Sequence, residues 1–234
     1  MAGMAGMASA GVALVLQRVP VVPASTLGER LDVPGGRPPF PVVEPLALLL
    51  PRGLRRGSIV AVHGSLALLL ALLAAATAQG VWAAVVGVGD LGVLAAAEAG
   101  VVVQRLALVP RPGLDPASVA AALLDGVGLV ALAGTDRMPP GVRRSLAARA
   151  RQRGSVLLPL GRWPGAEVEL DCRVEAWYGA EAGYGRLRAR EVVVRAAGRG
   201  AAARPRTARL LLPGPDGVVA QALPDLTPGI RAAG

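Results

Sequence analysis

The chain has no lysine among its 234 residues, and it is almost as poor in aromatic side chains and cysteine. Aromatic residues make up 3% of the sequence although 53% of it is hydrophobic, so alanine, valine and leucine must build the core. The absence of lysine excludes a phosphate-binding loop of the usual kind, whose lysine reaches the β- and γ-phosphates of a nucleotide. The single cysteine, Cys172, excludes an internal disulfide framework and is typical of the reducing cytoplasm, where we expect this protein.

All the basic residues are therefore arginines, and they give the chain a formal net charge of +9. Basic domains often bind nucleic acid or an acidic partner. A solvated arginine surface with no such partner is the alternative. Charge alone does not choose between them.

The longest hydrophobic run, Ser65–Ala78, is too short for a membrane span, which needs ~20 apolar residues. We interpret it as a buried core helix. The N-terminus lacks a basic stretch before its apolar run Val12–Leu16, so no signal peptide is expected. The sequence predicts no membrane association.

Short apolar runs alternate with helical segments between residues 58 and 160. Continuous apolar runs are typical of parallel strands that helices cover on both faces. The predicted strands are Ser58–His63, Val81–Val86, Leu106–Val109, Val127–Leu132 and Val156–Leu160. The predicted helices are Ser65–Gln79, Leu91–Ala99, one that Asp115 caps and Pro116 begins, and Pro140–Arg153. The fold class is therefore α/β, with a mainly parallel sheet flanked by helices.

The pattern changes after residue 165, where charged and apolar residues alternate. This alternation predicts an antiparallel C-terminal extension of the sheet. Its predicted strands are Glu167–Trp177, Arg186–Arg195, Arg209–Leu212 and Val218–Leu223, with a hairpin turn at Tyr178–Gly185. We expect a flexible segment over residues 1–42, one domain over residues 43–223 and a disordered tail over residues 224–234.

The first strand passes through Gly64 and Ser65 directly into its helix, so the loop is too short to cradle phosphates. The residues that follow the strand ending at Leu132 are Ala133 and Gly134, where an NTPase needs a magnesium-binding acid. Asp136 lies farther along in a predicted turn, and Asp90 is interpreted as the N-cap of the next helix. We therefore expect no catalytic residue, no cofactor and no metal, with Gly64 and Ser65 as a degenerate phosphate loop.

The order of these elements resembles a RecA-type core. The resemblance is clearest at Leu54–Gly64, Gly80–Val86 and the closing strands Leu187–Arg195 and Ala208–Pro213. Within that superfamily the chain is similar to the actinobacterial ImuA-prime group, degenerate RecA-like accessory proteins of the damage-inducible mutasome. The motifs that carry this similarity are Pro45–Pro51, Asp90–Gly92, Ala121–Gly126, Gly161–Gly165 and Leu211–Gly217, in that order.

This resemblance implies binding partners rather than a catalytic activity. They are a Y-family-like polymerase homologue (ImuB-like) and, through it, an error-prone replicative-type DNA polymerase. Contact with DNA is expected to be weak or indirect. Two other functions remain open on the residues alone: a nucleotide-binding regulator with an altered pocket, and a RecA-like DNA-binding protein.

Two groups of side chains are candidates for these contacts. Rare aromatics and nearby arginines are typical of interface anchors, and they predict a partner-binding surface formed by Trp163, Tyr178, Tyr184, Arg186 and Arg188. A second group, with Glu191 as its only acidic neighbour along the strand, predicts contacts to DNA phosphates: Arg195, Arg199, Arg204, Arg206 and Arg209. This second group lacks interleaved aromatics for base stacking.

Overall fold

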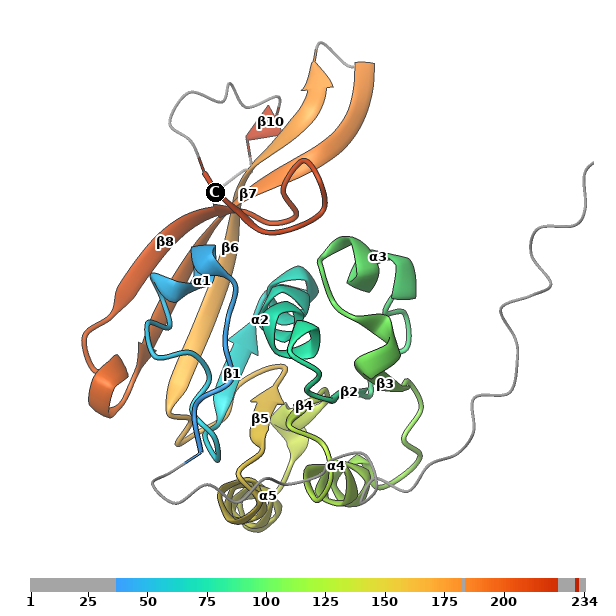
Figure 1. Ribbon diagram of the computed structural model, residues 1–234, viewed down its shortest axis with the longest axis vertical. Coiled ribbons are helices and arrows are strands. Elements are labelled where there is room, and N and C mark those ends of the chain that lie inside the picture. Colours follow the sequence, from blue (N-terminus) through green and yellow to red (C-terminus); the bar gives the residue numbers. More distant parts are fainter. Residues whose placement is uncertain (1–36, 182–183, 223–229, 232–234) are drawn as a thin grey trace, which may run out of the picture.

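The structure is a computed structural model, and it describes residues 37–181, 184–222 and 230–231 (Figure 1). Four parallel strands lie in the order β3, β2, β4, β5. Their bounds are Leu106–Val109, Ala83–Val86, Leu129–Leu132 and Val156–Pro159. The next strand is β1 (Val60–His63), which lies parallel to β5 through the bridges of Ile59 with Leu157 and of Val62 with Leu160. The expected α/β core with a parallel sheet is confirmed.

Antiparallel strands extend the sheet beyond β1. The first of them, β6 (Val168–Glu181), pairs parallel with β1 and antiparallel with β7 (Tyr184–Gly198). Antiparallel pairing then continues to β8 (Arg206–Leu211) and β9 (Ala220–Gln221). The predicted antiparallel C-terminal extension is thus present, and it places β1 between the two halves of the sheet.

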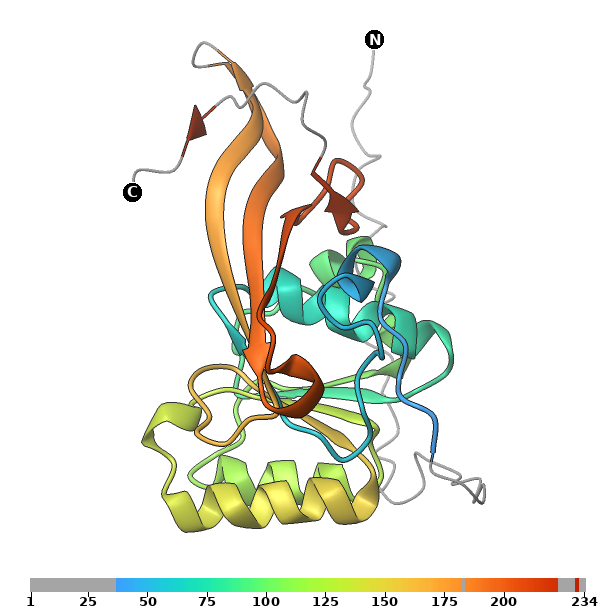
Figure 2. The same cartoon turned by 90° about the vertical axis from the view of Figure 1, so that its left-hand side faces the viewer.

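Helices cover both faces of the parallel part of the sheet (Figures 1 and 2). One face carries α1 (Glu44–Ala47), α2 (Leu66–Ala78) and α3 (Val93–Glu98), and the other carries α4 (Pro116–Leu124) and α5 (Pro140–Arg153). The described residues also form three short 3₁₀ helices: η2 (Val103–Arg105), η3 (Thr135–Arg137) and η4 (Gly200–Ala202). None of the helices in these described segments is long and apolar enough to cross a membrane.

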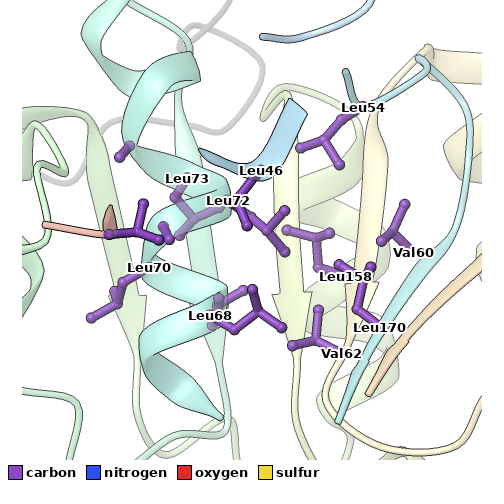
Figure 3. Packing of buried hydrophobic residues seen from close by; sticks show 14 of the residues in the cluster. Leu46, Leu54, Val60, Val62, Leu68, Leu70, Leu72, Leu73, Leu158 and Leu170 are labelled. Carbon is purple, nitrogen blue, oxygen red and sulfur yellow. The ribbon is translucent and has the colours of Figure 1, made fainter. Parts of the chain in front are cut away.

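The core under α2 consists of aliphatic side chains, as the scarcity of aromatics requires. Figure 3 shows the leucines of α2, among them Leu68 and Leu72, facing Val60, Val62 and Leu158 of the sheet. Leu68 and Leu72 are fully buried. Burying a leucine side chain stabilises the fold by roughly 1.5–3 kcal/mol. A helix that is apolar on all sides is therefore stabilised by its packing in the core.

Local end signals position the helices where the sequence predicts them. The Ser65 hydroxyl accepts a hydrogen bond from the Leu68 amide, and the Asp115 carboxylate accepts one from the Ser118 amide. The prediction that Asp90 is an N-cap is wrong. The helix α3 begins at Val93, two residues after the predicted start, and its N-cap residue is Gly92. Asp90 is exposed in the turn before that helix.

The folded domain extends beyond both expected boundaries. Phe40 is buried, and its backbone exchanges two hydrogen bonds with Leu54. Residues 40–42 therefore belong to the domain, and residues 1–36 of the segment that we expected to be flexible lie outside the described part. At the other end, β10 (Ile230–Arg231) pairs with β6 at Ala176 and Trp177, so this part of the expected tail is ordered.

The hairpin of β6 and β7 is longer than the sequence suggests. The predicted turn at Tyr178–Gly185 is wrong, since Tyr178 pairs with Ala189 and Ala180 pairs with Gly185 within the two strands. Gly179 has a φ of +104°, and the strand register shifts between Tyr178 and Ala180. A glycine that marks a β-bulge thus resembled a turn residue in the sequence. As a result the hairpin projects well beyond the body of the domain (Figure 2).

An ion-pair cluster fastens α5 to the end of α4. Arg149 donates two hydrogen bonds to the Asp125 carboxylate, at 2.8 and 2.6 Å, and Arg153 donates a third at 3.0 Å. The hydrogen bond from Arg149, followed by the charges of both arginines, lowers the pKa of Asp125 below its ordinary 3.8. The stabilisation is therefore complete above that ordinary value and is lost as the pH falls through the lowered one.

We expect Asp125→Asn to lower the free energy of unfolding at pH 7 by less than ~1 kcal/mol, because the pair is partly exposed. Below pH 3.8 the stability of the variant should fall less steeply than that of the parent chain, because asparagine does not take up a proton there. Urea unfolding at a series of pH values measures both effects. Asp216→Asn is the control, since Asp216 is exposed and has no ion pair within the described ranges. Equal pH profiles for the two variants would contradict this expectation.

Candidate functional site

The turn between β1 and α2 stands where a nucleotide-binding protein of this architecture holds its phosphates. Gly64 has a φ of +80°, and a Cβ on it would lie 2.3 Å from the Cys172 carbonyl oxygen. The backbone of β6 therefore lies directly against the turn. Ser65 follows as the N-cap, and its hydroxyl bonds to the Leu68 amide rather than facing an open loop.

Arg190 of β7 also contacts this turn, in which Gly64 is exposed and Ser65 is half-buried. Its Nη2 donates to the Ser65 hydroxyl at 3.1 Å, and its Nε donates to the Leu212 carbonyl at 2.8 Å. The guanidinium also lies 5.4 Å from the centre of the Trp177 ring, a cation–π distance. A cation thus occupies the helix N-terminus, although that end of a helix favours anions. Its hydrogen bonds to protein acceptors offset this cost.

Cys172 lies beside the same turn and is chemically quiet. Burial raises the pKa of its thiol, while the hydrogen bond with Ser65 and the charge of Arg190 oppose that shift only in part. The thiol is buried and stays protonated at neutral pH. Because the thiolate is the reactive form of cysteine, this environment does not create a nucleophile.

Asp136 and His63 lie near the carboxyl ends of the neighbouring strands, in η3 after β4 and at the last position of β1. The carboxylate of Asp136 accepts a hydrogen bond from the Arg162 amide at 3.1 Å and so holds the turn after β5 in place. His63 is half-buried at the end of β1. Within residues 37–181, 184–222 and 230–231, no three side chains of the metal-binding types lie close enough to hold an ion. Asp136 therefore has a structural role at this edge.

The predicted partner-binding residues do not form one surface. Trp163 is only 2% exposed and belongs to the core under α4 and α5, so it is not a surface anchor. Tyr178 is half-buried, and its hydroxyl donates to the Glu191 carboxylate. The side chain of Tyr184 lies outside the described residues, although its backbone begins β7. Arg186 and Arg188 remain exposed on the projecting hairpin.

The predicted phosphate-binding arginines also divide into separate groups. Arg209 is ion-paired with Glu175 at 3.3 Å and with Glu191 at 3.5 Å. The expectation that Glu191 alone opposes these arginines is therefore wrong, because β6 brings further acids beside them. Arg195 is exposed and pairs in register with Asp171 of β6. The remaining three line a pocket beside the connection between the end of β7 and the beginning of β8: Arg199, Arg204 and Arg206.

Comparisons with known proteins agree on the domain and its fold. The family model described as the MT3502 N-terminal domain matches residues 48–165, which span β1 to β5 and the turn between β1 and α2. The uncharacterized protein Rv3395c of Mycobacterium tuberculosis is 44% identical over 126 residues, or 53% of this chain. The chain spans 62% of the length of that relative. The crystal structure of the RadB recombinase superposes with a TM-score of 0.57 over 77% of this chain and 97% of that one, at 13% identity. The architecture is therefore RecA-like.

Proposed function

We propose that this chain, which belongs to the MT3502 N-terminal domain family, is a non-catalytic adaptor of damage-induced translesion DNA synthesis in the cytoplasm. It binds a Y-family-like polymerase homologue and so supports error-prone repair and mutagenesis. An error-prone replicative-type polymerase joins through that homologue, and DNA is contacted weakly or indirectly. Support for these partners comes from the motifs that resemble the ImuA-prime group. They follow one another along the chain in the same order, from Pro45–Pro51 to Leu211–Gly217.

The packing of β6 and Arg190 against the β1–α2 turn is the single observation that carries the proposal. The Cys172 carbonyl lies against Gly64, and Arg190 bonds to the hydroxyl of Ser65. A phosphate at this position would meet a carbonyl oxygen rather than a row of free amides. The chain also lacks the lysine that would neutralise phosphate charge. A RecA-like scaffold without an open phosphate loop and its lysine can still bind other proteins through its surface.

The projecting hairpin is the surface best placed to bind the polymerase homologue. Arg186 and Arg188 lie opposite Gly179, at an irregularity in the pairing of β7 with β6, and both are exposed. Leu187, which stands between them in the sequence, is 50% exposed and adds apolar area to this part of the hairpin. An exposed leucine between two cations matches an acidic surface with a hydrophobic centre. The hairpin extends beyond the helices of the domain (Figure 2).

Affinity purification of the tagged chain from cells with damaged DNA tests the proposal. We expect the Y-family-like polymerase homologue among the co-purifying proteins, and its recovery should be unchanged when ATP is depleted from the lysate. A variant with Gly64→Ala is unsuitable here, because its expected loss of stability would lower recovery whatever the role of the turn. Recovery of nucleotide-processing enzymes without any polymerase homologue would overturn the proposal, as would loss of the homologue after ATP depletion.

The isolated chain should bind single-stranded DNA weakly and without sequence preference. Its exposed arginines, such as Arg195 and Arg199, attract phosphates, but no aromatic side chains are interleaved with them for stacking. Affinity should fall steeply between ~50 and ~200 mM salt because each neutralised phosphate releases a counterion. Fluorescence anisotropy of labelled oligonucleotides across a salt series measures this. Tight binding that resists salt would favour an independent DNA-binding function instead.

A further inference from the structure

A pocket of about 480 Å³ lies at the opposite end of β1 from the β1–α2 turn. Its walls come from the segment between α1 and β1 and from the connection between β7 and β8, which lie side by side in both views (Figures 1 and 2). Ser58 and Val60 contribute from the beginning of β1, whereas Gly64 follows its end. The pocket is therefore separate from the turn and from the tip of the hairpin.

The rim of this pocket is strongly basic. Six arginines line it against a single carboxylate, that of Glu167: Arg37, Arg52, Arg55, Arg199, Arg204 and Arg206. Glu167 is already engaged, since Arg55 donates two hydrogen bonds to it and that contact raises the pKa of Arg55. Four of the others are exposed and have no ion pair within the described ranges: Arg52, Arg199, Arg204 and Arg206. The rim thus carries uncompensated positive charge that favours an anionic ligand.

The floor of the pocket is apolar. It is formed by Leu49, Leu50, Val60, Val168 and Ala196. Ser58 also lines the pocket, and its buried hydroxyl has no hydrogen-bond partner in the described part of the chain. A buried polar group left unpaired costs roughly 1–3 kcal/mol, so a ligand that bonds to it recovers that cost. A charged rim, an apolar floor and one unpaired hydroxyl together describe a site for an amphipathic anion.

We propose that this pocket binds an acidic peptide segment of a partner protein. Its aspartate or glutamate side chains pair with the arginine rim, and an aliphatic side chain between them lies on the apolar floor. A peptide fits better than single-stranded nucleic acid, because no aromatic side chain lines the pocket and bases bind mainly by stacking. An inorganic anion would leave the floor uncovered. This docking site does not depend on the proposed mutasome role or on the hairpin surface.

A fluorescein-labelled peptide of alternating glutamate and leucine is a direct probe for the full-length chain. Fluorescence polarisation should show saturable binding at moderate salt. Two control peptides, alternating lysine with leucine and alternating glutamate with serine, should bind at least ~10-fold more weakly, because one removes the charge match and the other the apolar side chains. An oligodeoxythymidine of the same length tests for nucleic acid.

Charge reversal on the rim separates this site from general attraction. Arg204→Glu and Arg206→Glu should each weaken peptide binding at least ~10-fold. The matched control is Arg111→Glu, which makes the same charge change on an exposed loop after β3, at the far edge of the sheet. An equal loss in the control would overturn the proposal, because it would show attraction by net charge alone.

Two further variants test the interior of the pocket. Ala202→Trp fills it and should abolish peptide binding, whereas Ala203→Trp on the next, exposed residue outside the lining should leave binding intact. Ser58→Ala should weaken binding while leaving the chain equally or more resistant to urea, because it removes an unpaired buried hydroxyl. Failure of every peptide to bind would refute the proposal. So would tighter binding of the oligodeoxythymidine that the same rim variants abolish.

Discussion

Replacing Gly64 by alanine should destabilise the folded chain by at least ~3 kcal/mol. Two costs combine at this position. A residue with a side chain loses roughly 1–2 kcal/mol in the left-handed conformation that Gly64 adopts at φ +80°. The added Cβ would also lie 2.3 Å from the Cys172 carbonyl oxygen, a backbone atom that cannot move without displacing β6. Urea unfolding followed by circular dichroism measures the change.

Gly113→Ala is the matched control for this prediction. Gly113 has a φ of +76°, but nothing lies within 4 Å of where its Cβ would stand. It should therefore show the conformational cost alone, at about 1–2 kcal/mol. The difference between the two variants isolates the close approach of β6 to the turn. If both variants lose the same stability, the turn has free space in front of it, and the account of β6 packed against the turn fails.

Reversing the two exposed arginines of the hairpin should weaken binding of the polymerase homologue at least ~10-fold, equivalent to ~1.4 kcal/mol. The variant carries both Arg186→Glu and Arg188→Glu. Its thermal midpoint should stay close to that of the parent chain, because these exposed side chains contribute no core packing. Surface plasmon resonance with the purified homologue gives the affinity, and differential scanning fluorimetry gives the midpoint.

The control for the hairpin variant reverses two arginines elsewhere. Arg111→Glu with Arg137→Glu makes the same change in net charge at exposed positions, one in the loop after β3 and one in η3 after β4. This control should retain most of the affinity. If the control loses as much affinity as the hairpin variant, long-range charge rather than the hairpin determines binding. If neither loses affinity, the partner binds another surface.

The helices and parallel strands of the core could be predicted from the sequence because local signals mark their ends. Pro140 begins α5 and Gly154 ends it as predicted, because proline suits a first helical turn and glycine the left-handed position after the last one. The parallel strands were recognisable as continuous apolar runs between such signals. The hairpin was not, because Gly179 lies within β6, opposite extra residues of β7, and yet resembles a turn residue in the sequence.

The candidate sites depend on contacts that no local pattern encodes. Arg190 lies 125 residues from Ser65 in the sequence, and only the pairing of β7 with β6 brings the two together. Trp163 looked like an interface anchor because aromatics are rare here, yet a buried tryptophan is also the largest side chain available to a core of small residues. The arginine-rimmed pocket combines residues 37–55 with residues 196–206, so it exists only in the folded chain.

The central claim is that a RecA-like scaffold works here as an adaptor that needs no nucleotide. Isothermal titration calorimetry of the purified chain with the Y-family-like polymerase homologue tests it most directly, with and without ATP and Mg²⁺. The account predicts a complex of the same affinity in both conditions and no release of phosphate by the chain. The lysine-free sequence and the packing of β6 and Arg190 against the Gly64–Ser65 turn require that result. Affinity that depends on ATP, or phosphate release by the chain, would contradict it.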